Sequence, residues 1–192
     1  MKKVCVYCGS SDSVNPEYIS GARELGRLLA QKGIGLVYGG GKIGLMGAVA
    51  DGVLEAGGEV HGVIVESMNT PALAHGGLSS LEVTATMQQR KWRMFEKADA
   101  FIALPGGYGT FDELFETITW AQIGVHEKPI GLLSLRGYFE PLWKMVKHAE
   151  AEGFIYREHA DMLCISDKTE DLLDCLANHS PDREAVRRWM RQ

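Results

Sequence analysis

The sequence predicts an α/β fold built on one doubly wound parallel sheet. Short runs rich in β-branched and other apolar residues alternate along the chain with longer segments of helical periodicity, and three of the runs end in glycine-rich turns. Strands that alternate with helices lie parallel and are joined by right-handed crossovers. Ligands in such sheets bind at the carboxyl ends of the strands, where the strand order reverses, so we expect the functional site there.

The strands are expected where the β-rich runs fall. In chain order they occupy residues 4–8, 34–38, 59–65, 81–84, 100–104, 130–133 and 162–165.

Helices are expected between most of these strands. For the first of them, Asn15 is a candidate N-cap, Pro16 takes the first helical position and Gly33 lies just past the end. The helical segments are residues 18–31, 44–56, 87–98, 110–123, 138–152 and 168–178, followed by a basic terminal helix at about 181–191.

Length and composition are those of one globular domain. The chain has 192 residues and a mass of 21.1 kDa, so we expect residues 1–192 to form a single domain with one core. A net charge of -5 disfavours a nucleic-acid partner, because phosphate backbones bind basic surfaces. No apolar run approaches the roughly 20 residues that span a bilayer, and Met1-Lys2-Lys3 leads directly into a strand. We therefore expect a cytoplasmic protein with no membrane partner.

Cys5 and Cys8 form a C-x-x-C pair, which could indicate a redox pair or half of a zinc site. In a strand, residues three apart point to opposite faces, and Cys164 and Cys175 are too widely spaced to supply a second C-x-x-C. We expect buried structural thiols and no metal site.

Three glycine-rich turns follow expected strands: "CGSSDS" from Cys8, "YGGGKIGLMG" from Tyr38 and "PGGYGTFDE" from Pro105. The second contains G-x-G-x-x-G, with Glu66 at the end of the next strand as a possible ribose ligand. That motif lies in the second strand-to-helix turn rather than the first, so it is weak support for dinucleotide binding. A Walker A motif is excluded, because Lys42 is followed by Ile43 instead of Ser or Thr.

The third turn is the most informative. Gly106, Gly107 and Gly109 can adopt conformations closed to other residues and let a ligand approach the backbone. The helix that follows presents unpaired N–H groups and the positive end of its dipole. This turn is therefore expected to bind a phosphate.

Glu113 has two interpretations. It completes a T-x-x-E capping box with Thr110, a purely structural role. On a helical wheel, however, Glu113 lies with Thr117 and Trp120 on a face beside the core stripe, and a carboxylate beside a large aromatic there indicates a cleft or a subunit interface. The core stripe itself is predicted to be Phe111, Leu114, Phe115, Ile118 and Ala121.

The preceding helix carries two candidate ligands in "MQQRKWRMFEKA". Lys91 falls in the middle of its apolar arc and Arg90 at the edge of that arc, whereas Arg93 and Lys97 belong to a solvated basic face. An inward-facing cation beside a phosphate site has an evident use.

These motifs resemble, in order and spacing, the LOG (lonely guy) family of cytokinin riboside 5'-monophosphate phosphoribohydrolases. The matching segments are "CGSS", "YGGGKIGLMG", "MQQRK" and "PGGYGTFDELFETITWAQIGVHEKP", and the resemblance covers about residues 4–175. It implies a Rossmann-like fold, a homodimer with the site near the interface, and hydrolysis of adenosine-type monophosphates (AMP and its N6-modified relatives) to free base and ribose 5-phosphate. Sequences of this kind were often labelled lysine decarboxylases, but this chain has no pyridoxal-site pattern, and we expect no cofactor.

Position by position, the resemblance implies roles for individual residues. Arg90 and Glu113 are expected to be the catalytic pair. Two departures leave the base preference open: Gln88 stands where the family commonly has His, and Ala72 where it commonly has Glu. The residues expected to bind substrate are Lys91, Gly106, Gly107, Tyr108, Gly109, Thr110, Phe111, Asp112, Thr119, Gly40, Gly41 and Ser10.

The expected chemistry follows from the bond that breaks. Cleavage of a ribosyl N-glycosidic bond builds positive charge on the sugar, so Glu113 is expected to stabilise that charge or to activate water. Arg90 stays protonated and cannot be the general acid, which leaves the proton donor to the base unassigned. The alternatives are a non-catalytic nucleotide or cofactor carrier and a dinucleotide oxidoreductase.

Overall fold

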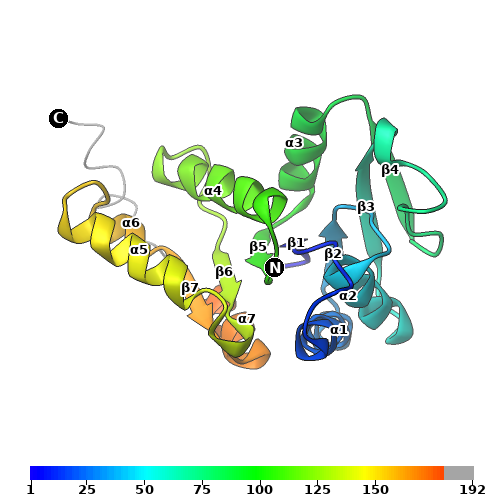
Figure 1. Ribbon diagram of the computed structural model, residues 1–192, viewed down its shortest axis with the longest axis horizontal. Coiled ribbons are helices and arrows are strands. Elements are labelled where there is room, and N and C mark those ends of the chain that lie inside the picture. Colours follow the sequence, from blue (N-terminus) through cyan, green and yellow to red (C-terminus); the bar gives the residue numbers. More distant parts are fainter. Residues whose placement is uncertain (180–192) are drawn as a thin grey trace.

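The computed structural model describes residues 1–179, which form one seven-stranded parallel sheet with helices on both faces (Figure 1). The strands are β1 (Lys3–Tyr7), β2 (Gly35–Tyr38), β3 (Val60–Val65), β4 (Ser80–Thr84), β5 (Ala100–Ala103), β6 (Ile130–Leu133) and β7 (Leu163–Ser166). Their order is β4-β3-β2-β1-β5-β6-β7, and every neighbouring pair is parallel. The predicted fold class is confirmed.

The strand order reverses beside β1. This strand pairs with β2 on one side, Val4 opposite Leu36, and with β5 on the other, Val4 opposite Ala100. The chain builds outward in one direction from β1 to β4 and then in the other from β5 to β7. The loops that follow β1 and β5 therefore lead to opposite faces of the sheet, which is where such folds bind their ligands.

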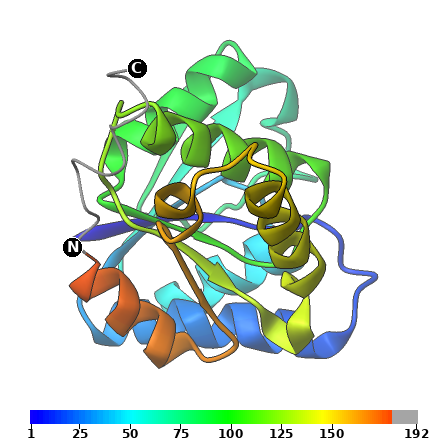
Figure 2. The ribbon, with the colours of Figure 1, turned by 90° about the vertical axis from the view of Figure 1, so that its left-hand side faces the viewer.

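The helices are α1 (Pro16–Gln31), α2 (Gly44–Glu55), α3 (Met87–Lys97), α4 (Tyr108–Gln122), α5 (Glu140–Ala151), α6 (Arg157–Ala160) and α7 (Thr169–Asn178), with short 3-10 turns η1 (Glu66–Met68) and η2 (Leu135–Gly137). In Figure 2 the blue α1 and the orange α7 lie on one side of the sheet and the green α4 on the other. Two apolar clusters result. One packs α1, α2 and α7 against the sheet, and the other packs α3 and α4 against its opposite face.

Helices α1 and α2 touch backbone to backbone. A Cβ on Gly26 would lie 2.2 Å from the carbonyl oxygen of Val49, and one on Gly52 would lie 2.1 Å from that of Arg23. Only glycine allows this approach.

The boundaries of the first helix are as predicted. Asn15 accepts a hydrogen bond from the N–H of Glu17, Pro16 is the first helical residue, and Gly33 follows with a φ of +68°. Three short elements were not expected: η1, η2 and α6. The predicted terminal helix at 181–191 lies outside the described residues.

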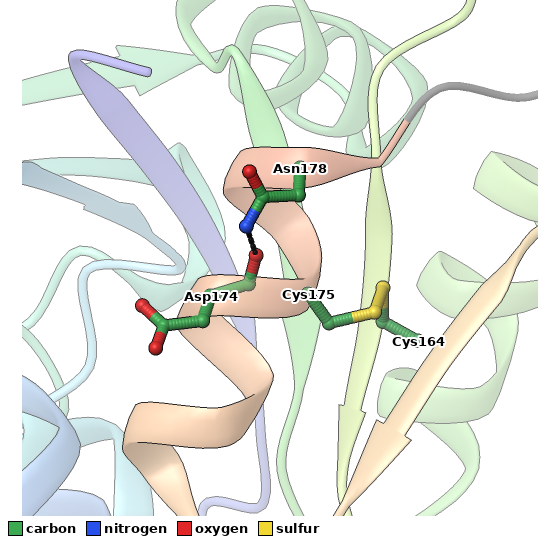
Figure 3. Close-up of a disulfide and its surroundings, with 4 residues drawn as sticks. All are labelled: Cys164, Asp174, Cys175 and Asn178. Carbon is green, nitrogen blue, oxygen red and sulfur yellow. Dashed lines mark hydrogen bonds between the residues drawn. A yellow bond between two sulfur atoms is a disulfide. The ribbon is translucent and has the colours of Figure 1, made fainter.

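The cysteines are partly as predicted. Cys5 and Cys8 are buried free thiols in the two opposite apolar clusters, which confirms their placement on opposite faces of the sheet. Cys164 and Cys175 form a disulfide that joins β7 to α7 (Figure 3). Their spacing gave no indication of it, because the strand and the helix are brought together only by packing.

Candidate active site

Two hollows lie at the carboxyl edge of the sheet, on either side of Ser10. The smaller, of about 130 Å³, is lined by Ser10, Gly39, Gly41, Ile43, Met46, Ile64, Met68, Leu73 and Arg90. The larger, of about 330 Å³, is lined by Gly9, Ser10, Ser11, Val14, Tyr18, Leu45, Pro105, Gly106, Gly107 and Tyr138. All three glycine-rich turns therefore contribute to one region, at the edge of the sheet where the site was expected.

The turns after β1 and β5 meet in the lining of the larger hollow. The N–H of Gly9 donates to the carbonyl of Pro105 at 3.0 Å. A Cβ on Gly106 would lie 2.1 Å from Thr110 Oγ1 and 2.8 Å from the nitrogen of Gly9, so this position is closed to other residues. The hydroxyl of Tyr138 donates to the carbonyl of Gly106 from the far side.

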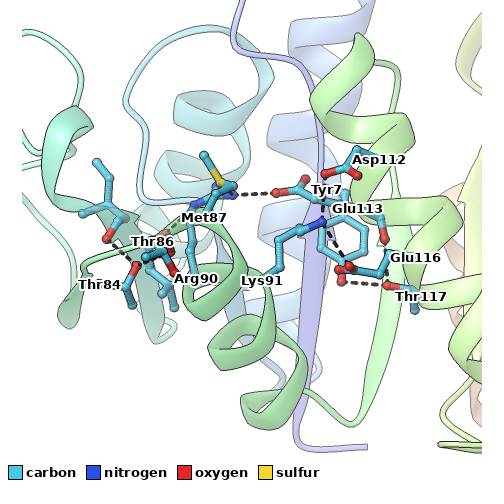
Figure 4. A network of polar contacts seen from close by, with 12 residues as sticks. Tyr7, Thr84, Thr86, Met87, Arg90, Lys91, Asp112, Glu113, Glu116 and Thr117 are labelled. Atoms are coloured by element: carbon cyan, nitrogen blue, oxygen red, sulfur yellow. Dashed lines mark hydrogen bonds and ion pairs between the residues drawn. The ribbon is translucent and has the colours of Figure 1, made fainter.

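Arg90 and Glu113 form a buried ion pair across α3 and α4 (Figure 4). Arg90 Nη1 lies 2.7 Å from Glu113 Oε1, and the two side chains are only 10% and 11% exposed. Arg90 Nε donates to the carbonyl of Val63 at 3.0 Å. Burial raises the pKa of Glu113 above its ordinary value, although the nearby guanidinium opposes this shift. The structure thus joins the two residues that were expected to be catalytic.

Gly39 leaves the space that the guanidinium fills. A Cβ at this position would lie 2.1 Å from Arg90 Nη2. Sequence reasoning noted Gly39 only as part of the G-x-G-x-x-G motif. Its neighbour Gly40, expected to bind substrate, has a φ of +75°. A Cβ at Gly40 would point toward the side chains of Leu81 and Ile64.

The N-terminus of α4 is open to solvent. The helix begins at Tyr108 with Gly107 as N-cap and no side-chain cap. Its first intrahelical bond runs from the N–H of Phe111 to the carbonyl of Gly107, which leaves the three preceding N–H groups without an intrahelical acceptor. A Cβ on Gly107 or Gly109 would meet no heavy atom within 4 Å. The backbone there is accessible to an anion.

The conformational reason given for the turn's glycines is wrong. None of Gly106, Gly107 and Gly109 is among the residues with positive φ. Gly106 is required by the close approach of Gly9 and Thr110, whereas Gly107 and Gly109 keep the approach to the N–H groups clear.

The capping-box interpretation of Glu113 is also wrong. Because α4 begins at Tyr108 rather than at residue 110, Thr110 lies in its first turn, buried beneath Gly106. The carboxylate of Glu113 points to Arg90 and does not return to the helix terminus. A cap of that kind occurs at α3, where Thr86 Oγ1 accepts from the N–H of Gln89 at 3.2 Å.

Lys91 faces inward, as predicted, but it has partners on α4. Its Nζ lies 3.0 Å from Asp112 Oδ2 and 3.1 Å from Glu116 Oε1, and its side chain is 14% exposed. These two ion pairs of the ammonium therefore join α3 to α4. Arg93 and Lys97, assigned to a solvated face, both pair with Glu82.

The predicted core stripe of α4 is partly wrong. Phe115 is 39% exposed, whereas Thr110 and Thr117 are buried with Leu114 and Ala121. Trp120 packs edge-on against Phe95 with a centroid distance of 4.9 Å and is not among the exposed large apolar residues. Thr119 is exposed and donates to the carbonyl of Phe115.

Only part of the predicted site lines the two hollows. Arg90, Ser10, Gly41, Gly106 and Gly107 are in the linings. The predicted site residues outside both linings are Gly40, Lys91, Tyr108, Gly109, Thr110, Phe111, Asp112, Glu113 and Thr119.

Several residues near the site had no sequence signal. The hydroxyl of Tyr138 hydrogen-bonds to Gly106, 32 residues away in the sequence, and the hydroxyl of Tyr7 hydrogen-bonds to Thr117, 110 residues away. Met68 and Leu73 enter the smaller hollow from the loop after β3, which is tied to the second turn because the N–H of His75 donates to Gly40. Such contacts follow from packing and have no local pattern.

Some classes of site can be judged over residues 1–179. No group of three or more His, Cys, Asp or Glu side chains in that range could hold a metal ion. No helix of the described part is both long and apolar enough to cross a membrane.

Known proteins share this fold. A molybdenum cofactor binding protein from the phototrophic bacterium Rippkaea orientalis superposes with a TM-score of 0.69 at 21% identity, over 92% of this chain and 96% of that one. The Moco carrier protein of Chlamydomonas reinhardtii gives 0.69 at 20% identity, over 92% and 95%. At this identity the likeness concerns the fold alone.

Sequence relatives are closer. A family model described as possible lysine decarboxylase matches residues 46–176. The cytokinin riboside 5'-monophosphate phosphoribohydrolase LOG of Oryza sativa subsp. japonica is 41% identical over 188 residues, 98% of this chain and 78% of the relative. LOG4 of Arabidopsis thaliana is 42% identical over 184 residues, 96% and 86%. Identity at this level over nearly the whole chain places the protein in the LOG family of cytokinin riboside 5'-monophosphate phosphoribohydrolases.

Proposed function

We infer that this protein hydrolyses the N-glycosidic bond of adenosine-type nucleoside 5'-monophosphates, AMP and N6-modified cytokinin riboside monophosphates, to free base and ribose 5-phosphate. The observation that carries this function is the buried Arg90–Glu113 pair behind the uncapped N-terminus of α4. Glu113 lies five residues after Tyr108, which places it about 7.5 Å along the helix axis. A phosphate on the N–H groups of the turn would leave the ribose beside the carboxylate.

Glu113 suits both parts of the reaction. As the bond from C1' to the base nitrogen breaks, the ribose ring gains positive charge, which a fixed carboxylate stabilises more than it stabilises the substrate. Water then supplies the oxygen that bonds to C1', and its protons end on the sugar hydroxyl, the base or a buffering group. Because burial raises the pKa of Glu113, this carboxylate is also a stronger base toward that water than an ordinary glutamate.

Arg90 orients Glu113 and places the positive charge of its guanidinium beside the leaving base. Its guanidinium lines the smaller hollow, whose other side chains are aliphatic apart from Ser10. A purine in this hollow would lie against Met46 and Leu73 and accept a hydrogen bond from the guanidinium. The arrangement favours a planar apolar base at one end of the site and a phosphate at the other.

A carrier function is the alternative, because the Moco carriers have the same fold. A carrier needs the glycine turns but has no use for a carboxylate fixed beside the ribose. Incubation with AMP and N6-modified AMP separates the two: release of free base supports the hydrolase, and binding without turnover supports the carrier.

The 5'-phosphate should be required for efficient cleavage. Its contacts with the N–H groups of α4 are charge-assisted and worth roughly 1.5 to 3 kcal/mol each. We expect adenosine to be cleaved with kcat/KM at least about tenfold below that of AMP, measured by chromatography of the released adenine. Equal values for the two substrates would contradict a phosphate site at this turn.

We also propose that the chain is a homodimer formed through α3 and α4. Trp92 and Phe115 lie on these helices and are 45% and 39% exposed, and Met87 adds a further 39% exposed side chain. Exposed apolar surface of this kind favours a two-fold interface. Light scattering at micromolar concentration should give about twice the chain mass of 21.1 kDa. The mass measured for Trp92→Glu should be lower than that of the wild type. A wild-type mass of one chain would contradict the dimer.

A cytoplasmic location is proposed as well, and it has a testable consequence. Disulfides are rare in reducing compartments. If the protein is cytoplasmic, Cys164 and Cys175 should be thiols in freshly lysed cells, and alkylation followed by mass spectrometry would reveal both labels. An unlabelled pair would count against this location.

A further inference from the structure

Thr117, at the centre of α4, is held from three directions. Its Oγ1 donates to the carbonyl of Glu113 at 2.8 Å, and its own carbonyl accepts from His126 Nε2 at 3.0 Å. The hydroxyl of Tyr7 lies 3.0 Å from Thr117 Oγ1 (Figure 4). Thr117 is 2% exposed, so these hydrogen bonds are shielded from solvent.

The direction of each hydrogen bond is fixed by counting protons. Thr117 has one hydroxyl proton, which it gives to the carbonyl of Glu113. Toward Tyr7 its oxygen can only accept, so the phenol is the donor. Burial raises the pKa of Tyr7, which keeps the phenol protonated and able to donate. His126 is fixed as a donor through Nε2, because its Nδ1 accepts the N–H of Lys128 at 3.0 Å.

Tyr7 is held firmly in place at the start of this series of hydrogen bonds. It ends the central strand β1 beside the strand reversal, is 3% exposed, and stacks on Phe101 with a centroid distance of 5.9 Å. The turn that lines both hollows starts at the next residue. Tyr7 therefore immediately precedes that turn in the chain, and its hydroxyl contacts the turn of α4 that carries Glu113.

We propose that Tyr7 is a positioning residue whose hydroxyl, acting through Thr117, fixes the direction in which α4 presents the Glu113 carboxylate. This inference rests on the proposed function, because it assigns Glu113 to the reaction. A threonine that bonds back to the carbonyl four residues earlier tilts that carbonyl and bends the helix locally. The phenol locks the threonine in that rotamer. Without it, the hydroxyl of Thr117 can turn, and the turn of α4 that holds Glu113 loses its fixed tilt.

The test compares two tyrosines. Tyr7→Phe removes the hydroxyl and keeps the ring on Phe101. Tyr38→Phe is the matched control, because Tyr38 is fully buried on β2 and its hydroxyl has no hydrogen-bond partner among the described residues. We expect kcat for AMP to fall about tenfold in Tyr7→Phe with KM within about twofold, and both constants to stay within about twofold in Tyr38→Phe.

Further variants separate positioning from general destabilisation. Thr117→Val should lower kcat as Tyr7→Phe does, whereas Thr117→Ser keeps the hydroxyl and should retain the wild-type kcat. In the double variant of Tyr7→Phe and Thr117→Val, kcat should be no lower than in Thr117→Val alone. In a Glu113→Gln background, Tyr7→Phe should leave the residual rate unchanged. Circular dichroism and the thermal midpoint would establish that each variant is folded.

Each outcome is decisive. Wild-type kcat in a folded Tyr7→Phe protein, or a further tenfold loss in the Glu113→Gln background, would overturn the positioning role while leaving the hydrolase function intact. Wild-type protein that releases no base from AMP or N6-modified AMP in the same assay would overturn both.

Discussion

Replacing Glu113 by Gln should lower kcat for AMP by about a hundredfold or more, with nucleotide binding preserved. The change is isosteric and keeps an oxygen that can accept from Arg90 Nη1. It removes the negative charge that offsets the charge developing on the ribose, and loss of one preorganised electrostatic group typically costs this much. The turn proposed to bind the phosphate is untouched, so the dissociation constant for AMP should change little.

The pH dependence gives a second readout of the same residue. In the proposed mechanism Glu113 acts as a carboxylate, and burial raises its pKa above the ordinary 4.5. The wild-type kcat should therefore fall as the pH decreases through that raised pKa, at a higher pH than an exposed glutamate would give. In Glu113→Gln this acid limb should be absent.

Glu116→Gln is the matched control. It makes the same chemical change one turn further along α4, at a carboxylate that pairs with Lys91 rather than Arg90. We expect kcat within about threefold of wild type, since Asp112 still pairs with Lys91. A folded Glu113→Gln protein with near wild-type turnover would return Glu113 to a structural role.

Gly39→Ala should be nearly as damaging as the loss of Glu113, although it adds only a methyl group. The new Cβ would lie 2.1 Å from Arg90 Nη2 and 3.2 Å from Met46 Sδ. The guanidinium cannot move aside without breaking its bonds to Val63 and Glu113. Misplacement of a reacting group by about 1 Å can cost roughly a hundredfold, and we expect a loss of that order in kcat/KM.

Gly76→Ala controls for the substitution itself. Gly76 lies in the loop after β3, and a Cβ there would meet no heavy atom within 4 Å. This variant should keep wild-type kinetics. Wild-type kcat/KM in a folded Gly39→Ala protein would mean that the observed position of the guanidinium is not needed for turnover.

The order and type of the main elements could be predicted from the sequence. Alternating β-rich runs and helical segments gave all seven strands, because a buried parallel strand needs a continuous apolar run and its crossover helix needs a stripe. The first helix was predicted nearly to the residue, since Asn15, Pro16 and Gly33 act within one turn of its ends. The site was expected at the carboxyl ends of the strands, and the glycine turns line the hollows there because parallel strands all end at that edge.

The start of α4 shows where local patterns mislead. The motif from Thr110 to Glu113 fits a capping box, but the helix begins two residues earlier, and Gly106 packs close to both Gly9 and Thr110. That contact joins loops far apart in the sequence. Glu113 is therefore free to pair with Arg90.

The sequence was enough to predict the sheet, its longer helices and, through family resemblance, Arg90 and Glu113 as candidate catalytic residues. It also indicated the turn before α4 as a candidate anion site. The partners of the individual side chains became known only from the packed fold. It paired Arg90 with Glu113, gave Lys91 two carboxylate partners, brought Tyr7 to Thr117 and joined Cys164 to Cys175. The two kinds of information differ in the distance along the chain over which they act. Periodicity, capping and turn chemistry act over a few neighbouring residues, whereas the partners of a buried polar group are set by which elements pack together, and that packing depends on the whole core.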